Sequence, residues 1–266
     1  MRSILPISLL ALTLLGDGCT TSRRATSVER PDFAKYFSEA GVTGTFVLYD
    51  PAARRYLVHN PDRAHERFIP ASTFKVLNSL VALETGVVAD TTTVFEWDGV
   101  ERSIPQWNRD HTLATAFENS AVWVYQELSR RIGATRMQDY VGRAKYGNGN
   151  IGGGIDQFWL SGGLRISAIE QANFLERLHE RRLPFSERTA ELVEGIMVEG
   201  RGPDHVLHAK SGWADGIPAD IGWYVGYVVR EDRTHYFALN IDIERTEQGA
   251  ARRGIARAIL VDLGLL

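Results

Sequence analysis

The stretch Ala71-Ser72-Thr73-Phe74-Lys75, followed by an apolar run to Gly86, decides the fold of this chain. Pro70 stands just before it and cannot lie inside a helix. Apolar residues then recur at helical spacing, and the glycine supplies a stop signal. We therefore expect Ser72 in the first turn of a buried helix. Residues three apart share a helix face, so the Lys75 amine should lie above the Ser72 hydroxyl.

This pair is a candidate nucleophile and base. A serine hydroxyl attacks only with the help of a nearby base, and burial lowers the pKa of a lysine amine until it can act as one. The helix N-terminus also offers free N–H groups to a developing oxyanion. The alternative is that Ser72 only caps the helix and Lys75 lies on the surface. That alternative is favoured if the pair is taken alone, because S-x-x-K is a common pattern.

Composition narrows the function classes. The chain has 266 residues, of which 44% are hydrophobic, and a net charge of −3, which suits one large domain or two small ones. No basic patch with interleaved aromatic residues stands out, so we expect no nucleic-acid partner. The seven histidines and the single cysteine lack metal-ligand spacing, so we expect no metal site.

The first residues read as an export signal. One arginine precedes an apolar run from Ile4 to Leu15, which is too short to span a bilayer. We predict a signal segment at 1–18, a polar tether at 19–30, a single catalytic domain at 31–266, and a periplasmic location. Cys19 lies where a lipoprotein signal would be cut, and Gly18 fits that reading. Asp17 and the glycine before it fit poorly, so a lipid anchor at Cys19 is the lesser alternative.

Periodicity predicts the elements. We expect helices at 31–40, from Ser72 to about 86, and at 114–132, 134–141, 167–182, 186–198 and 250–263. We expect strands at 45–50, 56–59, 206–211, 221–230 and 234–243, and loops at 60–70, 89–113 and 145–163. Strands at both ends with helices between favour an α+β fold. Its antiparallel sheet of five to seven strands would be built from both chain ends, beside a mostly helical insertion, with the site at their seam.

Two further segments carry chemistry. The hydroxyl of Ser120, in Ser120-Ala121-Val122, could relay a proton to a leaving amine, or it could simply cap a helix. In Lys210-Ser211-Gly212, the lysine and the hydroxyl could hold a substrate carboxylate, and the glycine would let a ligand approach the backbone. The N–H of Trp213 could join that of Ser72 as an oxyanion donor. The alternative for this segment is an ordinary strand-to-turn signal.

A third segment, Tyr146-Gly147-Asn148, lies in the glycine-rich stretch and alone would be a turn. In the order S-x-x-K, S-x-V, Y-G-N, K-S-G, the four segments together resemble the class D β-lactamases, the oxacillinases. The segments Phe158-Trp159-Leu160 and Gly222-Trp223-Tyr224-Val225-Gly226 strengthen the resemblance, which runs from about Thr45 to the C-terminus. K-S-G replaces the commoner K-T-G and keeps the hydroxyl.

The resemblance implies a penicillin-binding, β-lactamase/transpeptidase-like fold and a serine β-lactamase (EC 3.5.2.6) that confers antibiotic resistance. Ser72 would form an acyl-enzyme with penicillins and related β-lactams. Lys75 would be the general base after reacting with CO2 to give N6-carboxylysine, the only cofactor implied. The indole of Trp159 would donate to that carbamate, and Phe74, Val122 and Leu160 would line its pocket.

The same resemblance assigns the remaining roles. Ser120 would transfer a proton to the β-lactam nitrogen, and Lys210 would set the electrostatics of the site. The implied substrate-binding residues are Tyr146, Ser211, Gly212, Trp213 and Arg252. Arg252 is the better match to the family's carboxylate-binding arginine, and Arg253 is the alternative one position later.

Two other functions use similar motifs. A cell-wall transpeptidase or carboxypeptidase shares S-x-x-K and K-[ST]-G, but the segments around Tyr146 and Trp159 argue against it. A β-lactam sensor domain would stay acylated, but such domains belong to proteins with several membrane spans. The sequence leaves a homodimer open.

Overall fold

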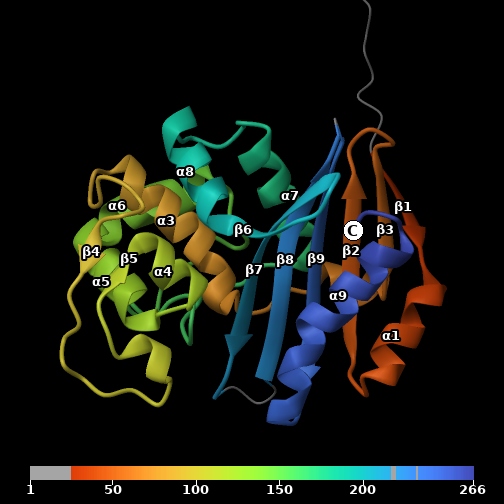
Figure 1. The fold of residues 1–266 in the computed structure, drawn as a ribbon, viewed down its shortest axis with the longest axis horizontal. Coiled ribbons are helices and arrows are strands. Elements are labelled where there is room, and N and C mark those ends of the chain that lie inside the picture. The colour runs from red at the N-terminus through yellow and green to blue at the C-terminus, as the bar shows by residue number, and fades with distance from the viewer. Residues whose placement is uncertain (1–24, 217–219, 232) are drawn as a thin grey trace, which may run out of the picture.

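A single seven-stranded sheet organises the computed structural model, which describes residues 25–216, 220–231 and 233–266 (Figure 1). The predicted signal segment and Cys19 lie outside the described residues. The strand order is β1-β3-β2-β9-β8-β7-β6. The strands are β1 (Thr26–Glu29), β2 (Gly44–Asp50), β3 (Arg55–His59), β6 (Val198–Arg201), β7 (His205–Ala214), β8 (Asp220–Arg230) and β9 (Arg233–Ile243).

The sheet joins the two ends of the described chain. β2 pairs antiparallel with β9, so an early strand and the last strand are neighbours. All neighbouring pairs are antiparallel except β1 and β3, which are parallel. The prediction of an antiparallel sheet of five to seven strands built from both ends is therefore confirmed.

Helices cover both faces of the sheet. On one face lies α7, which packs against β2, β8 and β9; on the other lies α9, with α1 beside it (Figure 1). The α-helices are α1 (Ala34–Glu39), α2 (Pro61–His65), α3 (Lys75–Glu84), α4 (Leu113–Glu118), α5 (Val122–Ile132), α6 (Ala134–Arg143), α7 (Ala168–His179), α8 (Glu187–Met197) and α9 (Ala251–Asp262). Short 3-10 helices are η1 (Pro31–Phe33), η2 (Ala71–Phe74), η3 (Pro105–Trp107) and η4 (Thr246–Ala250), and a small ladder pairs β4 (Val94–Phe95) with β5 (His111–Thr112).

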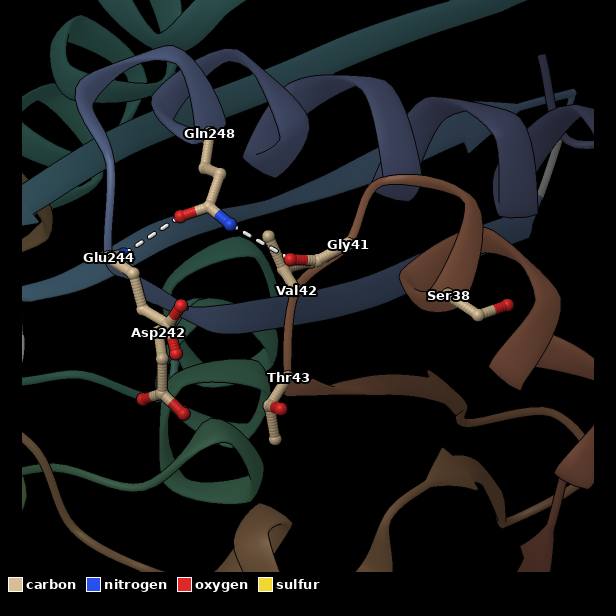
Figure 2. Close-up of a pocket in the computed structure, with 7 residues that line it drawn as sticks. All are labelled: Ser38, Gly41, Val42, Thr43, Asp242, Glu244 and Gln248. Carbon is tan, nitrogen blue, oxygen red and sulfur yellow. Dashed lines mark hydrogen bonds between the residues drawn. The ribbon is translucent and has the colours of Figure 1, made fainter.

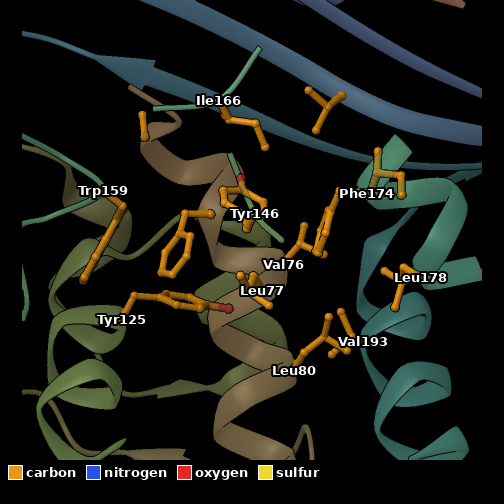
Figure 3. Packing of buried hydrophobic residues seen from close by; sticks show 14 of the residues in the cluster. Val76, Leu77, Leu80, Tyr125, Tyr146, Trp159, Ile166, Phe174, Leu178 and Val193 are labelled. Carbon is orange, nitrogen blue, oxygen red and sulfur yellow. The ribbon is translucent and has the colours of Figure 1, made fainter. Parts of the chain in front are cut away.

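Two hydrophobic cores follow from this layering. Alternation along β8 sends Trp223 and Val225 to the helical side and Tyr224 to the side of α9. α3 runs through the first core, where Val76, Leu77 and Leu80 pack among aromatic and aliphatic side chains of α5, α7 and α8 (Figure 3). Every residue of α3 from Lys75 to Leu83 is buried. The sheet and helices thus enclose a lysine amine.

Four local predictions were wrong. The helix expected at 114–132 is two helices, α4 and α5, broken at 119–121. Residues 26–29, expected in the polar tether, form β1; their exposed side chains carry no alternating pattern. The expected loop at 60–70 contains α2, whose N-cap Asn60 accepts from the Arg63 N–H. No strand was expected after the helix at 186–198, yet β6 follows α8 directly, from Val198 to Arg201.

Within the residues that the structure describes, none of the helices combines the length and the apolar character that crossing a membrane requires.

Candidate active site

Ser72 and Lys75 meet at the start of α3. Ser72 lies in η2, where the Ala71 N–H donates to the Trp159 carbonyl at 3.0 Å. Lys75 Nζ donates to Ser72 Oγ at 2.6 Å. The Lys75 side chain is fully buried, and Ser72 is 9% exposed. The amine is therefore within reach of the hydroxyl proton, as the i, i+3 spacing predicts.

Burial also sets the charge of Lys75. The loss of solvation lowers the pKa of Lys75 well below its ordinary value, and the nearby positive charge of Lys210 lowers it further. Its Nζ also lies 5.2 Å from the centre of the Tyr125 ring. A neutral amine can accept a proton from Ser72, which a charged one cannot.

A buried donor without a partner lies close by. The Trp159 Nε1 has no hydrogen-bond acceptor, although the side chain is fully buried. Its ring stacks on Phe74, the residue before Lys75, with the ring centres 5.5 Å apart. Such a donor is costly to leave unpaired, so it suits an acceptor that arrives later. A carboxylate formed on the Lys75 nitrogen would meet this requirement.

Ser120 lies in the link between α4 and α5 and has a positive φ of 51°. Two bonds close the end of α4: the Ala121 N–H donates to the Ala116 carbonyl at 2.9 Å, and the Ser120 N–H donates to the Phe117 carbonyl at 3.2 Å. This pair of bonds is the Schellman motif, in which glycine usually occupies the left-handed position. Here a serine occupies it, and the turn presents its hydroxyl.

Lys210 on β7 reaches that hydroxyl. Its Nζ donates to Ser120 Oγ at 2.5 Å, and its side chain is almost fully buried. Burial, helped by the positive charges of Arg252 and Arg253, lowers the pKa of Lys210 from 10.5 to about 7. Ser120 and Lys210 thus form a second hydroxyl–amine pair near the first, since the charge of Lys210 acts on the pKa of Lys75.

β7 runs tightly past the nucleophile segment. A Cβ added at Gly212 would lie 3.0 Å from the Pro70 carbonyl oxygen and 3.2 Å from the Thr73 nitrogen. On the next strand, Trp223 Nε1 donates to the Ile69 carbonyl at 2.8 Å. The glycine therefore lets β7 approach Ser72, and the indole bond holds the sheet to the same segment.

The structure separates the two candidate arginines. Arg252 donates to the Gly212 carbonyl, and its guanidinium lies 5.1 Å from the centre of the Trp213 ring. Burial lowers the pKa of Arg252 to about 10, and the charge of Arg253 adds to the effect. Arg253 instead pairs with Glu199 at 3.0 Å on a more exposed surface. Arg252 is therefore the arginine beside the K-S-G segment.

Tyr146 is linked to the Ser72 segment through two neighbouring residues. It is fully buried, with its ring edge-on to Phe74, and its hydroxyl donates to Gln171 Oε1 at 3.4 Å. Gln171 Nε2 in turn donates to Thr73 Oγ1 at 2.7 Å. Through Gln171 and Thr73, Tyr146 thus supports the Ser72 segment. Sequence reasoning missed Gln171 and Thr73, because nothing in their spacing signals this contact. The contact of Tyr146 with substrate stays a prediction.

The remaining predicted residues flank these pairs. Val122 begins α5, directly after the Ser120 link, and Leu160 follows Trp159. Ser211, on β7, lines a cavity of about 660 Å³ with Lys210 and Arg253, between α4, the α8–β6 junction and β7. A separate hollow of about 220 Å³, between residues 38–43 and 242–248, contains none of the predicted site residues (Figure 2). Within 25–216, 220–231 and 233–266, no three His, Cys, Asp or Glu residues are grouped as metal ligands.

Sequence comparison matches most of this chain to one protein family and to β-lactamases within it. The penicillin binding protein transpeptidase domain matches residues 44–261. The β-lactamase OXA-48 of Klebsiella pneumoniae is 41% identical over 232 residues, which cover 87% of this chain and 88% of that protein. The β-lactamase OXA-10 of Pseudomonas aeruginosa is 38% identical over 251 residues, which cover 93% and 94%.

Solved structures agree. The class D β-lactamase YbXI from Nostoc superposes with a TM-score of 0.86 at 44% identity, covering 88% of this chain and 99% of that one. FUS-1 (OXA-85) from Fusobacterium nucleatum subsp. polymorphum, also a class D β-lactamase, gives a TM-score of 0.87 at 37% identity, covering 90% and 100%.

Proposed function

The chain belongs to the class D β-lactamases, and from this premise we propose that it hydrolyses the amide of penicillins through an acyl-enzyme on Ser72. The observation that carries the proposal is the buried Lys75 amine 2.6 Å from Ser72 Oγ. Ser72 Oγ bonds to the lactam carbonyl carbon while its proton passes to Lys75. The carbon–nitrogen bond then breaks, and water later cleaves the ester to free Ser72 and the opened product.

Ser120 completes the acylation step in this proposal. The lactam nitrogen leaves as an amine and needs a proton, which the Ser120 hydroxyl supplies and Lys210 restores across their 2.5 Å contact. Ser211 and Arg252 are proposed to hold the substrate carboxylate, because Arg252 donates to the carbonyl of Gly212, the residue after Ser211. The N–H groups of Ser72 and Trp213 are the proposed oxyanion donors.

CO2 is the proposed modifier of Lys75. A neutral, buried amine is the form that reacts with CO2, and the unpartnered Trp159 indole N–H is suited to hold the product. When present, the carbamate supplies a carboxylate as general base. Phe74, Val122 and Leu160 are proposed to keep the compartment dry.

The first test is Ser72→Ala, with Ser38→Ala as control because Ser38 is exposed on α1. A chromogenic cephalosporin and a fluorescent penicillin report turnover and covalent labelling. We expect Ser72→Ala to lose both and Ser38→Ala to keep both. Labelling that survives in Ser72→Ala refutes the nucleophile assignment. A single burst from the native enzyme, followed by a stable acyl-enzyme, would instead indicate a sensor or transpeptidase.

Export is proposed from the sequence alone. Residues 1–18 are the proposed signal segment, and the domain from residue 31 is proposed to work in the periplasm and to confer antibiotic resistance there. Cell fractionation of the native chain tests the location. Detergent partition of a Cys19→Ser variant tests a lipid anchor, and sedimentation tests a homodimer.

A further inference from the structure

The left-handed backbone of Ser120 is held from both sides by one short segment. Trp107, the last residue of η3, donates from Nε1 to the Asn119 carbonyl at 2.9 Å. Its own carbonyl accepts from Trp123 Nε1, also at 2.9 Å. Asn119 precedes Ser120, and Trp123 is the second residue of α5. The two bonds therefore tie η3 to both flanks of the serine.

η3 is itself fixed in place. The Gln106 carbonyl accepts from His111 Nε2 at 3.0 Å, and a carbonyl can only accept, so this ring nitrogen carries the proton. His111 Nδ1 then lies 3.1 Å from the hydroxyl of Thr115 on α4. Trp123 is 7% exposed, so its bond is shielded from water. The segment is thus anchored to α4 independently of its bonds to the two flanks.

We propose that Trp123, acting through Trp107, is a positioning residue that fixes the reach of the Ser120 hydroxyl. A non-glycine residue rarely adopts the backbone of Ser120 without support from its surroundings. The Schellman bonds close the end of α4, and packing on α3, α4 and α6 places α5. The two indole bonds then hold the turn between the helices on both flanks of Ser120, and with it the position of Ser120 Oγ between Lys210 and a bound substrate. The inference rests on the proposed proton transfer by Ser120.

A double-mutant cycle tests this coupling. The acylation rate by a fluorescent penicillin is measured for the native enzyme, Trp123→Phe, Ser120→Ala and the double variant. We expect Trp123→Phe to slow acylation about tenfold in the native background, since small misplacements of a reacting group are costly. In the Ser120→Ala background the same change should cost less than twofold, because the group that it positions is gone.

Trp97→Phe is the matched control. Trp97 Nε1 also donates to a backbone carbonyl, that of Val100 at 3.0 Å, but on an exposed loop. It should leave the acylation rate unchanged in both backgrounds. Trp107→Phe removes the other indole bond, from Trp107 Nε1 to the Asn119 carbonyl. It should therefore slow acylation in the same pattern as Trp123→Phe, and it takes the place of Trp123→Phe if the latter fails to fold.

The outcomes separate the two proposals. An equal loss from Trp123→Phe in both backgrounds, or no loss in the native one, overturns the positioning role. If Ser120→Ala is acylated as fast as the native enzyme, the proposed proton transfer by Ser120 is refuted, whatever the effect of Trp123→Phe.

Discussion

Two buried tryptophans contact the Ser72 segment and differ in one hydrogen bond. Trp223 Nε1 has the Ile69 carbonyl as its acceptor, whereas Trp159 Nε1 has none. Both side chains are fully buried, so replacement by phenylalanine removes a similar volume from each site. The difference between the two variants therefore isolates the effect of the indole bond.

We predict that Trp223→Phe is less stable than Trp159→Phe by about 1–3 kcal/mol, because only the former leaves a buried carbonyl unpaired. Urea unfolding in buffer free of CO2 measures the two free energies of unfolding. Equal values would mean that the Trp159 N–H has an acceptor even without CO2.

When bicarbonate is present, the proposed carbamate should make Trp159→Phe, and not Trp223→Phe, the more affected variant. Trp159→Phe should need about ten times more bicarbonate for half occupancy, because a hydrogen bond to a charged group is lost. Trp223→Phe should need the same concentration as the native enzyme. With carbon-labelled bicarbonate, the NMR signal of the carbamate carbon on Lys75 reports the occupancy without any turnover. Unchanged occupancy in Trp159→Phe would contradict its role as the donor.

The sequence predicted only those residues whose contacts are local or match a family motif. The spacing of Ser72 and Lys75 predicted their contact, because a helical turn determines it. Trp159 entered only through the family resemblance. The role of Trp123 could not be predicted from the sequence, because its hydrogen bond to Trp107 crosses a loop without any periodic pattern.

At the level of elements, the end of α4 was the main error. The pattern predicted one helix through residue 132, since no glycine or proline interrupts 114–132. The helix stops because Ser120 takes the left-handed position that glycine usually fills. The possible helix cap at Ser120 was the one local sign of this stop, and bonds from outside the helix support the position.

This position predicts a conflict between stability and activity. Ser120→Gly relieves the left-handed strain, whereas Ser120→Ala keeps it, and both remove the hydroxyl that Lys210 contacts. Ser120→Gly should therefore be more stable than Ser120→Ala by about 1 kcal/mol. Both should acylate slowly. Thermal unfolding and penicillin labelling measure the two effects, and equal stabilities would show that the backbone at Ser120 is unstrained.

For the whole molecule, the sheet was predictable in its centre and not at its edges. β8 and β9 alternate clearly and pair along their full length, whereas β1 and β6 are four residues each. Such edge strands depend on a neighbour that the sequence does not show locally. The consequence for function is that β7 packs against η2, directly before α3, while Lys210 on β7 reaches the link after α4. Lys75 and Lys210 are thereby both held out of water.

Those two lysines should make stability depend on pH. The pKa of Lys210 falls from 10.5 to about 7 on folding, and that of Lys75 falls as well. Between about pH 7 and 10.5 the unfolded chain binds more protons at Lys210 than the folded chain does, so the free energy of unfolding rises with pH. Between pH 7 and 9, Lys210 should account for about 2 kcal/mol of that rise.

Lys210→Met should therefore flatten the rise, and Lys145→Met, which replaces an exposed lysine, should not. Loss of the Lys210 charge also removes one cause of the lowered pKa of Lys75. The loss of Lys210 titration and the change at Lys75 therefore both reduce the rise of the free energy of unfolding with pH. Urea unfolding at pH 7, 8 and 9 measures the slopes. A slope in Lys210→Met as steep as in the native enzyme would mean that Lys210 keeps its proton in the folded state, and its contact with Ser120 would then be that of a fixed cation.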